Sequence, residues 1–234
     1  MKTSHVAFFL LGFVTFESLL IGFVDRPLSE YLRSVDAQHP EYINMFRSYT
    51  DIGKSKWYLI LSGLGFVMSA LALRLTSLKA SMREKIARIG IGLFFFFVSI
   101  AASGIVADII KPIVGRARPV MLDREGFYGF HPLTFQASWN SMPSGHTVTA
   151  FTIAGVLSFF FPRGQTFWLL FAAAIAVSRI MVNAHFLSDV FAGAGVGLFT
   201  VILLRYVFRH NVANHLIWGI FPIDRKNTLG KSEH

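Results

Sequence analysis

Residues 87–119 read ARIGIGLFFFFVSIAASGIVADIIKPIVGRARP, and the apolar part of this stretch decides the fold. From 87 to 110 it is almost entirely apolar and shows no strand-like alternation. A bilayer core needs about 20 consecutive apolar residues in a helix, so the stretch predicts a transmembrane helix. At its end, Lys111, Arg116 and Arg118 bring three cations together at the hydrophobic border.

The composition of the whole chain also indicates a membrane protein. Of 234 residues, 53% are hydrophobic, 25 are Phe and only 15% are charged, whereas soluble domains carry about a quarter charged residues. The absence of Cys from the sequence excludes disulfides and thiolate metal sites. The net charge of +9 is spread over loop ends. The positive-inside rule and anionic headgroups account for it, and we expect no nucleic-acid partner.

Six apolar stretches predict six transmembrane helices in an all-α, polytopic membrane bundle. Their approximate ranges are 6–24, 57–75, 87–110, 146–162, 166–184 and 188–208. The first could pass for a signal peptide, but its 19 residues are long for a signal core, and Asp25-Arg26-Pro27 follows in place of a small-residue cleavage site. We therefore expect a retained first helix and a single domain over 1–234.

The charges between the stretches predict the orientation of the chain. With the N-terminus inside, the cytoplasmic pieces are Lys2, the loop 76–86, the turn at Arg163 and the tail 209–234, which carry few acidic residues. In the opposite loop 25–56, five basic residues are offset by five acidic ones. The bias favours both termini in the cytoplasm and puts the polar segments described below on the external face.

Two external segments have features of their own. Loop 25–56 carries Leu28, Tyr31, Leu32 and Val35 at helical spacing, which predicts a short amphipathic piece that lies on the membrane surface and covers the site. The stretch 120–142 is aromatic and irregular. It either rests among headgroups or serves as a lid or a lipid-tail contact.

The first polar segment runs from Lys111 to Pro119. Arg118 offers a planar fork and Lys111 a mobile point charge, which together suit a phosphate. Arg116 lies between them and is a further candidate contact. The alternative is that these are ordinary cations snorkelling at a helix end. Asp108, three residues before Lys111, is expected to pair with it.

The second segment is Pro143-Ser144-Gly145-His146, at the start of an apolar stretch. Ser144 can cap a helix that begins at His146, and Gly145 lets the backbone approach an anion closely. Helix N-termini attract anions through their free N–H groups and dipole. His146 then stands where it could protonate a departing oxygen. The alternative is a plain cap beside an interfacial His.

The third segment runs from Ser178 to Asp189. His185 and Asp189 are four residues apart, hence on one face if the sixth helix has begun there. A carboxylate behind an imidazole fixes its tautomer and leaves the other ring nitrogen free to attack. Arg179 can reach over the same pocket. An i,i+4 surface pair is the alternative, although ionisable residues at membrane depth are usually functional. Glu17, inside the first stretch, is expected to face another helix or water.

Together the segments Lys111-x6-Arg118-Pro119, Pro143-Ser144-Gly145-His146 and Ser178-Arg179-x5-His185-x3-Asp189 match a three-part signature. By these motifs the chain resembles the phosphatidic acid phosphatase type 2 (PAP2) superfamily over roughly residues 105–205, and six helices fit its membrane branch. The resemblance implies that His185 is the nucleophile and forms a phosphohistidine, that Asp189 orients it, and that His146 is the general acid.

The resemblance also implies a phosphate-binding set of Lys111, Arg118, Arg179, Ser144 and the Gly145 N–H. Three cations can do what Mg²⁺ does in other phosphoryl transfers, and the sequence lacks an acidic cluster for a divalent metal. We therefore expect no metal and no cofactor.

The implied function is a lipid phosphatase at the periplasmic face of a bacterial inner membrane. Its partners would be a lipid phosphate and membrane lipids; the sequence names no protein partner. Phosphatidic acid, phosphatidylglycerol phosphate, undecaprenyl diphosphate and lipid A phosphates all remain, and the short chain resembles members that act on the last two. The alternatives are phosphate transfer to an acceptor lipid, or a non-catalytic lipid-binding or transport protein. The intact His146, His185 and Asp189 argue against the second.

Overall fold

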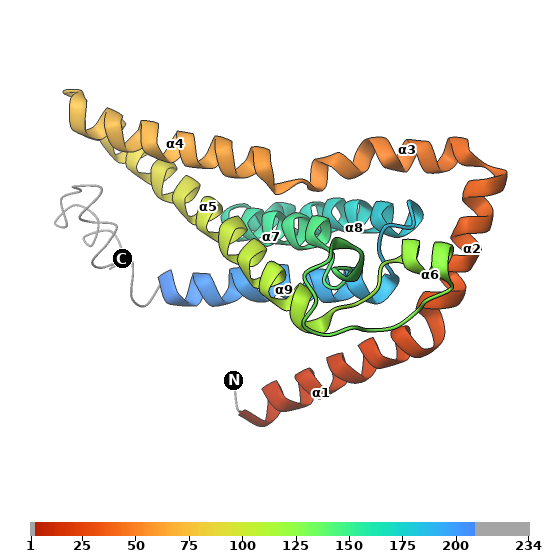
Figure 1. The fold of residues 1–234 in the computed structure, drawn as a ribbon. Coiled ribbons are helices and arrows are strands. Elements are labelled where there is room, and N and C mark those ends of the chain that lie inside the picture. The colour runs from red at the N-terminus through yellow and green to blue at the C-terminus, as the bar shows by residue number, and fades with distance from the viewer. Residues whose placement is uncertain (1–2, 209–234) are drawn as a thin grey trace. The chain divides into compact units, whose positions relative to one another are not determined.

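The computed structural model describes residues 3–208 as a succession of helices (Figure 1). The α-helices are α1 Thr3–Leu19, α2 Asp25–Gln38, α3 Pro40–Thr50, α4 Ser55–Leu75, α5 Ala80–Val114, α6 Pro119–Glu125, α7 Gly145–Phe160, α8 Gln165–Met181 and α9 Leu187–Val207. A π-helical turn, Leu20–Val24, joins α1 to α2, and short 3-10 turns lie at Asp51–Gly53, Ala137–Trp139 and Pro162–Gly164. Over residues 3–208 the all-α prediction is confirmed. The predicted tail 209–234 lies outside the described residues.

Four helical segments in this range are long and apolar enough to cross a membrane: Pro40–Leu75, Ala80–Val114, Pro162–Met181 and Leu187–Val207. They correspond to the predicted spans 57–75, 87–110, 166–184 and 188–208. Of the other two predicted spans, 146–162 forms the shorter apolar helix α7. The stretch 6–24 is helical through α1 and the π-helical turn.

The helix predicted to reach residue 184 ends earlier, at Met181. Asn183 has a φ of 48°, which is the left-handed conformation. A residue in this conformation commonly ends a helix. Its N–H bonds to the Ile180 carbonyl at 2.8 Å, and the Ala184 N–H bonds to the Arg179 carbonyl at 3.1 Å. The residues that follow, up to the start of α9, therefore form a loop.

The chain divides into two compact units. Among the described residues, one comprises 56–101 together with 202–208. In it, α4 and the first part of α5 pack through Leu73 and Ala87, both buried. The rings of Phe66 and Phe94 lie 4.9 Å apart, centroid to centroid.

The other unit comprises residues 3–55 and 102–201. Its helices α7 and α8 lie side by side (Figure 1) and pack through the buried residues Ala150, Ala154, Ala172 and Ile175. Small side chains at a helix interface let the two backbones approach closely, as in many membrane helix pairs.

Helix α9 approaches the start of α7 through glycines. A Cβ atom added to Gly193 would lie 2.8 Å from the Ser144 carbonyl oxygen, and one added to Gly197 would lie 2.7 Å from that of Val148. The Ser144 N–H donates to the Asp189 carbonyl at 2.9 Å. Close packing thus brings the second and third polar segments into direct contact.

The predicted amphipathic piece in loop 25–56 forms two helices, α2 and α3. In α2, Leu32 is buried at 5% exposure, whereas Tyr31, predicted for the same apolar face, is 64% exposed. Tyr31 precedes Leu32 by one residue and therefore points about 100° away around the helix.

Candidate active site

A glycine turn at the end of α5 sets the direction of the first polar segment. Gly115 has a φ of 57°, and its N–H donates to the Lys111 carbonyl at 2.8 Å. A Cβ atom here would lie 1.9 Å from the His131 carbonyl oxygen, so both conformation and space require glycine. The chain then runs antiparallel to residues 129–131, with a single β-bridge between Arg116 and Phe130.

Arg118 is held by backbone carbonyl groups. Its Nε donates to the Ala137 carbonyl at 2.9 Å and its Nη2 to the Asn140 carbonyl at 3.3 Å. Burial lowers the pKa of the Arg118 guanidinium. Because these acceptors are neutral, the positive charge stays available to an anion that enters the site.

Lys111 points toward the start of α7. Its Nζ donates to Asp108 Oδ1 at 2.8 Å, which confirms the predicted pair. A Cβ atom on Gly145 would lie 3.5 Å from Lys111 Nζ. The ammonium group therefore lies close to the backbone that was predicted to meet the phosphate.

Helix α7 begins at Gly145, one residue earlier than predicted. Ser144 occupies the N-cap position, but its side chain makes no capping hydrogen bond. Its Oγ instead accepts a hydrogen bond from Thr147 Oγ1 at 3.1 Å. The predicted cap is therefore wrong in its hydrogen bond. The Ser144 hydroxyl proton remains available, since Oγ is the acceptor in the contact with Thr147.

His146 packs against the turn Asp51–Gly53. A Cβ atom on Gly53 would lie 2.9 Å from His146 Cβ and 3.0 Å from Ile175 Cγ2. The His146 Nε2 atom is buried and has no hydrogen-bond partner among residues 3–208. The imidazole is close enough to Arg179 and His185 to interact with both electrostatically.

Arg179, in the last turn of α8, reaches across to the end of α3. Its Nη1 donates to Thr50 Oγ1, while its Nε is buried without a partner in the described part of the chain. Like Arg118, the side chain thus keeps donor capacity for an anion.

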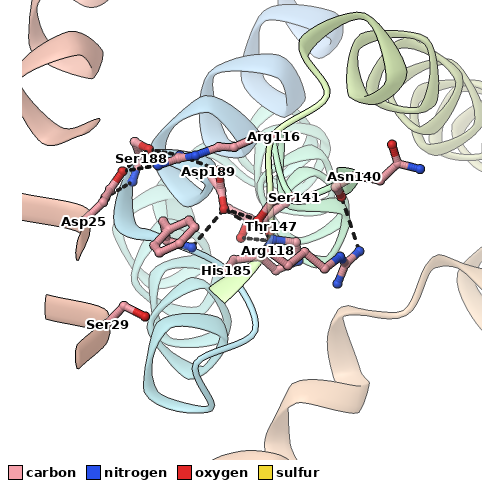
Figure 2. Close-up of polar contacts among 12 residues, drawn as sticks. Asp25, Ser29, Arg116, Arg118, Asn140, Ser141, Thr147, His185, Ser188 and Asp189 are labelled. Atoms are coloured by element: carbon pink, nitrogen blue, oxygen red, sulfur yellow. Dashed lines mark hydrogen bonds and ion pairs between the residues drawn. The ribbon is translucent and has the colours of Figure 1, made fainter. Parts of the chain in front are cut away.

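Asp189 is completely buried and its carboxylate is fully engaged (Figure 2). Oδ2 accepts hydrogen bonds from Ser141 Oγ at 2.5 Å and from the Phe186 N–H at 2.9 Å, and Oδ1 accepts one from Arg116 Nη1 at 2.6 Å. The Phe186 contact is one half of a capping box, in which the third residue of a helix bonds back to the N-cap.

His185 lies in the loop before α9, which begins at Leu187. The spacing predicted a shared helix face only if the helix had already begun at His185, and this condition is not met. His185 Nδ1 nevertheless lies 3.7 Å from Asp189 Oδ2. This separation is longer than a hydrogen bond, and Nδ1 has no hydrogen bond within residues 3–208.

Burial lowers the pKa of the His185 imidazole, and the charges of Arg118 and Arg179 lower it further, whereas Asp189 raises it. The net direction is downward, so the imidazole is neutral at neutral pH. A neutral imidazole has a free nitrogen lone pair, as a nucleophile requires.

Arg116, predicted as a further phosphate contact, lies elsewhere. It is 1% exposed. Nη1 binds Asp189, and Nη2 donates to Asp25 Oδ2 at 2.6 Å. The rings of Tyr128, Phe130 and Phe186 surround the guanidinium carbon at 5.8, 5.6 and 4.6 Å. Its donors are thus engaged with carboxylates and are not open to a substrate phosphate.

The aromatic stretch 120–142 has two parts. Tyr128 and Phe130 face Arg116. By contrast, Phe135 is 84% exposed. Phe127 packs edge-on against Trp139 at 5.0 Å between ring centroids. Part of the stretch therefore closes the polar cluster around Arg116, and part presents aromatic surface outward.

Asp25 was not predicted to take part in the site. It lies at the start of α2, is 1% exposed and binds Arg116 and Ser188. The sequence signal was an acidic residue directly after an apolar stretch. Glu17, expected to face another helix or water, is buried at 6% exposure. Its carboxylate oxygens have no hydrogen-bond partner in the described residues.

Comparison with known proteins identifies the family of the chain. The model of the PAP2 superfamily matches residues 92–213. Two relatives are named lipid A 1-phosphatase. That of Rhizobium johnstonii is 28% identical over 198 residues, 84% of this chain and 79% of its own, and that of Rhizobium etli is 30% identical over 159 residues, 68% of each chain.

A solved structure has a similar fold. The transmembrane PAP2-type phosphatidylglycerolphosphate phosphatase of Bacillus subtilis superposes with a TM-score of 0.56 at 20% identity, covering 86% of this chain and 96% of its own. The chain belongs to the PAP2 superfamily. Its all-helical fold is that of a membrane protein of this family.

Proposed function

We propose that the protein is a lipid phosphatase that hydrolyses a phosphomonoester or diphosphate on a lipid headgroup through a phosphohistidine at His185. The observation that carries this proposal is the pairing of the buried His185 with Asp189, Nδ1 to Oδ2 at 3.7 Å, beside the charges of Arg118 and Arg179. Binding alone would need the cations, but not a carboxylate held behind an imidazole.

In the first step, His185 Nε2 attacks the phosphorus atom. The bond from phosphorus to the leaving oxygen breaks, and His146 gives that oxygen a proton. Asp189 faces the opposite ring nitrogen, Nδ1, and stabilises the positive charge that develops on the imidazole as the P–N bond forms.

The phosphate oxygens are bound by Lys111, Arg118, Arg179, the Ser144 hydroxyl and the Gly145 N–H. Two observations support this assignment: Lys111 Nζ lies close to Gly145, and Arg118 and Arg179 both keep donor capacity. Phosphoryl transfer depends mainly on positioning and on such charge stabilisation.

In the second step, water attacks the phosphorus atom of the phosphohistidine. His146, now deprotonated, takes the water proton, the P–N bond breaks, and inorganic phosphate leaves. The cycle needs no metal. In residues 3–208 no group of three or more His, Asp or Glu side chains is arranged to hold one, and the two carboxylates of the site are paired with Arg116.

For the substrate, we propose a lipid A phosphate ahead of undecaprenyl diphosphate, since the two Rhizobium relatives named lipid A 1-phosphatase match most of the chain. For the topology, we propose six spans with both termini in the cytoplasm, which puts the site at the periplasmic face of a bacterial inner membrane. The charge distribution supports this orientation.

The test is phosphate release by purified protein in detergent with EDTA present, across lipid A, undecaprenyl diphosphate, phosphatidylglycerol phosphate and phosphatidic acid. We expect release from lipid A far above the others, and none from His185→Ala protein. Release that disappears with EDTA and returns with Mg²⁺ would contradict the metal-free mechanism. Silence until an acceptor lipid is added would instead indicate lipid-to-lipid transfer.

A further inference from the structure

A buried ionic network extends from the Asp189 carboxylate to the start of α2 (Figure 2). Arg116 lies at its centre, with Nη1 2.6 Å from Asp189 Oδ1 and Nη2 2.6 Å from Asp25 Oδ2. The side chains of all three residues are at most 1% exposed. One guanidinium thus joins two carboxylates that are 164 positions apart in the sequence, 25 and 189.

Asp25 also holds the first turn of α9. Its Oδ1 accepts the Ser188 N–H at 3.0 Å, and its Oδ2 accepts the Ser188 hydroxyl at 2.6 Å. Ser188 Oγ in turn accepts a hydrogen bond from Arg116 Nη1. Asp25 therefore contacts both the cation that binds Asp189 and the residue next to Asp189.

Helix α2 has a second attachment to the same loop. Ser29, one turn after Asp25, donates from its hydroxyl to Asn183 Oδ1 at 2.7 Å. Asn183 begins the turn that leads to His185. The loop that carries His185 is thus fixed to α2 at both of its ends.

We propose that Asp25 and Arg116 are positioning residues: they hold the Asp189 carboxylate so that Oδ2 faces His185. The inference rests on the proposed function, in which that pair carries the chemistry. Asp189 Oδ1 accepts a hydrogen bond from Arg116. Asp189 Oδ2 accepts hydrogen bonds from Ser141 and the Phe186 N–H and faces His185. Neither Asp25 nor Arg116 touches the substrate.

Two variants test the proposal. Asp25→Asn keeps the shape but replaces one acceptor oxygen by an NH₂ group. Both Asp25 oxygens receive donors, so either orientation of the amide opposes a donor to a donor. Arg116→Gln leaves two carboxylates buried without their cation. Arg116→Lys keeps the charge, but a single ammonium cannot reproduce the fork that reaches both acids.

We expect kcat to fall about 10–100-fold in Asp25→Asn, the range seen when the partners that orient metal-ligating side chains are removed, and further in Arg116→Gln, with Arg116→Lys in between. The KM for the lipid and the inhibition constant of inorganic phosphate should stay within about twofold, because the phosphate contacts are intact. The matched control is Arg26→Gln in the same helix, whose pair with Glu30 is exposed; its kcat should not change.

Kinetics are measured on monodisperse protein, with kcat expressed per folded molecule. A kcat of Asp25→Asn equal to that of Arg26→Gln would overturn the inference, as would parallel changes in kcat, KM and phosphate inhibition. Should Arg116→Gln not fold, Asp25→Asn and Arg116→Lys still decide the question. His185→Ala keeps the two claims apart: activity in that variant refutes the proposed function, whereas an inactive His185→Ala with an unaffected Asp25→Asn refutes only the positioning role.

Discussion

Substituting Gly53 by Ala tests whether His146 must be held in place to protonate the leaving group. The added Cβ would meet His146 Cβ at 2.9 Å, His146 Cδ2 at 3.0 Å and Ile175 Cγ2 at 3.0 Å. Carbon atoms pack best at about 3.5–4.0 Å. The methyl group is enclosed between α7 and α8, so it must displace one of its neighbours.

The geometry sets the size of the effect. Relieving the contact requires a movement of about 0.5–1 Å, and because the closest atom is His146 Cβ, the imidazole moves with it. A misplacement of about 1 Å at a reacting group can reduce a rate by about 100-fold. We therefore expect kcat for a lipid phosphate to fall about 10–100-fold. The overpacking itself should destabilise the fold by about 1–3 kcal/mol.

The assay compares two leaving groups. A lipid alkoxide or sugar oxygen needs a proton as it departs, whereas 4-nitrophenolate leaves without one. The comparison uses kcat/KM, which covers only the steps up to departure of the leaving group and not the later hydrolysis in which His146 acts as base for both substrates. Gly53→Ala should therefore lower kcat/KM much more for the lipid phosphate than for 4-nitrophenyl phosphate. Gly104→Ala is the control, since a Cβ at Gly104 meets nothing within 4 Å. Equal losses on both substrates, or no loss on either, would refute the role given to His146.

Three further outcomes are expected. Ser141→Ala removes the 2.5 Å hydrogen bond to Asp189 Oδ2 and should lower kcat about 10-fold, the value of one bond to a charged acceptor; an unchanged kcat would show that Arg116 and Phe186 suffice. The pKa of His185 is lowered by burial and by Arg118 and Arg179, and attack needs the neutral ring. The acid limb of kcat/KM should thus lie below the ordinary His value of 6.5, with activity lost as pH falls through it; a limb above that value would contradict the assignment. Gly197→Ala should lower the melting temperature by about 2–10 °C because its Cβ would lie 2.7 Å from the Val148 carbonyl oxygen. Gly155→Ala, whose Cβ would have ordinary contacts at 3.4 Å, should melt like the unchanged protein.

The sequence predicted the apolar helices and the polar residues at their borders, because both follow from local patterns. Long apolar runs allow few structures in a membrane, and a cation at the end of such a run is conspicuous. The contact of Lys111 with Asp108 also followed from a three-residue spacing on one helix.

Contacts between distant parts of the chain could not be predicted in this way. Arg116 was grouped with Lys111 and Arg118 because all three are cations within eight residues. Its side chain turns instead toward Asp25 and Asp189. Only packing decides which of two neighbouring arginines faces the substrate and which is buried with the acids.

The start of α9 shows a second limit. The four-residue spacing of His185 and Asp189 suggested one helix face, but the helix begins after His185. Asp189 is then the third residue of the helix and bonds back to the Phe186 N–H. The sequence pattern does not distinguish a carboxylate that caps a helix from one that faces an imidazole. Asp189 has both roles, since its Oδ2 accepts from the Phe186 N–H and lies opposite His185 Nδ1.

Whether His185 carries the phosphoryl group is tested most directly by trapping the phosphohistidine. Protein mixed rapidly with lipid phosphate is quenched in alkali, in which phosphohistidine survives, and the phosphorylated peptide is identified by mass spectrometry. We expect one added phosphoryl group on His185, formed faster than steady-state turnover and absent from His185→Ala. Phosphate on another residue, or turnover by His185→Ala at the normal rate, would contradict it.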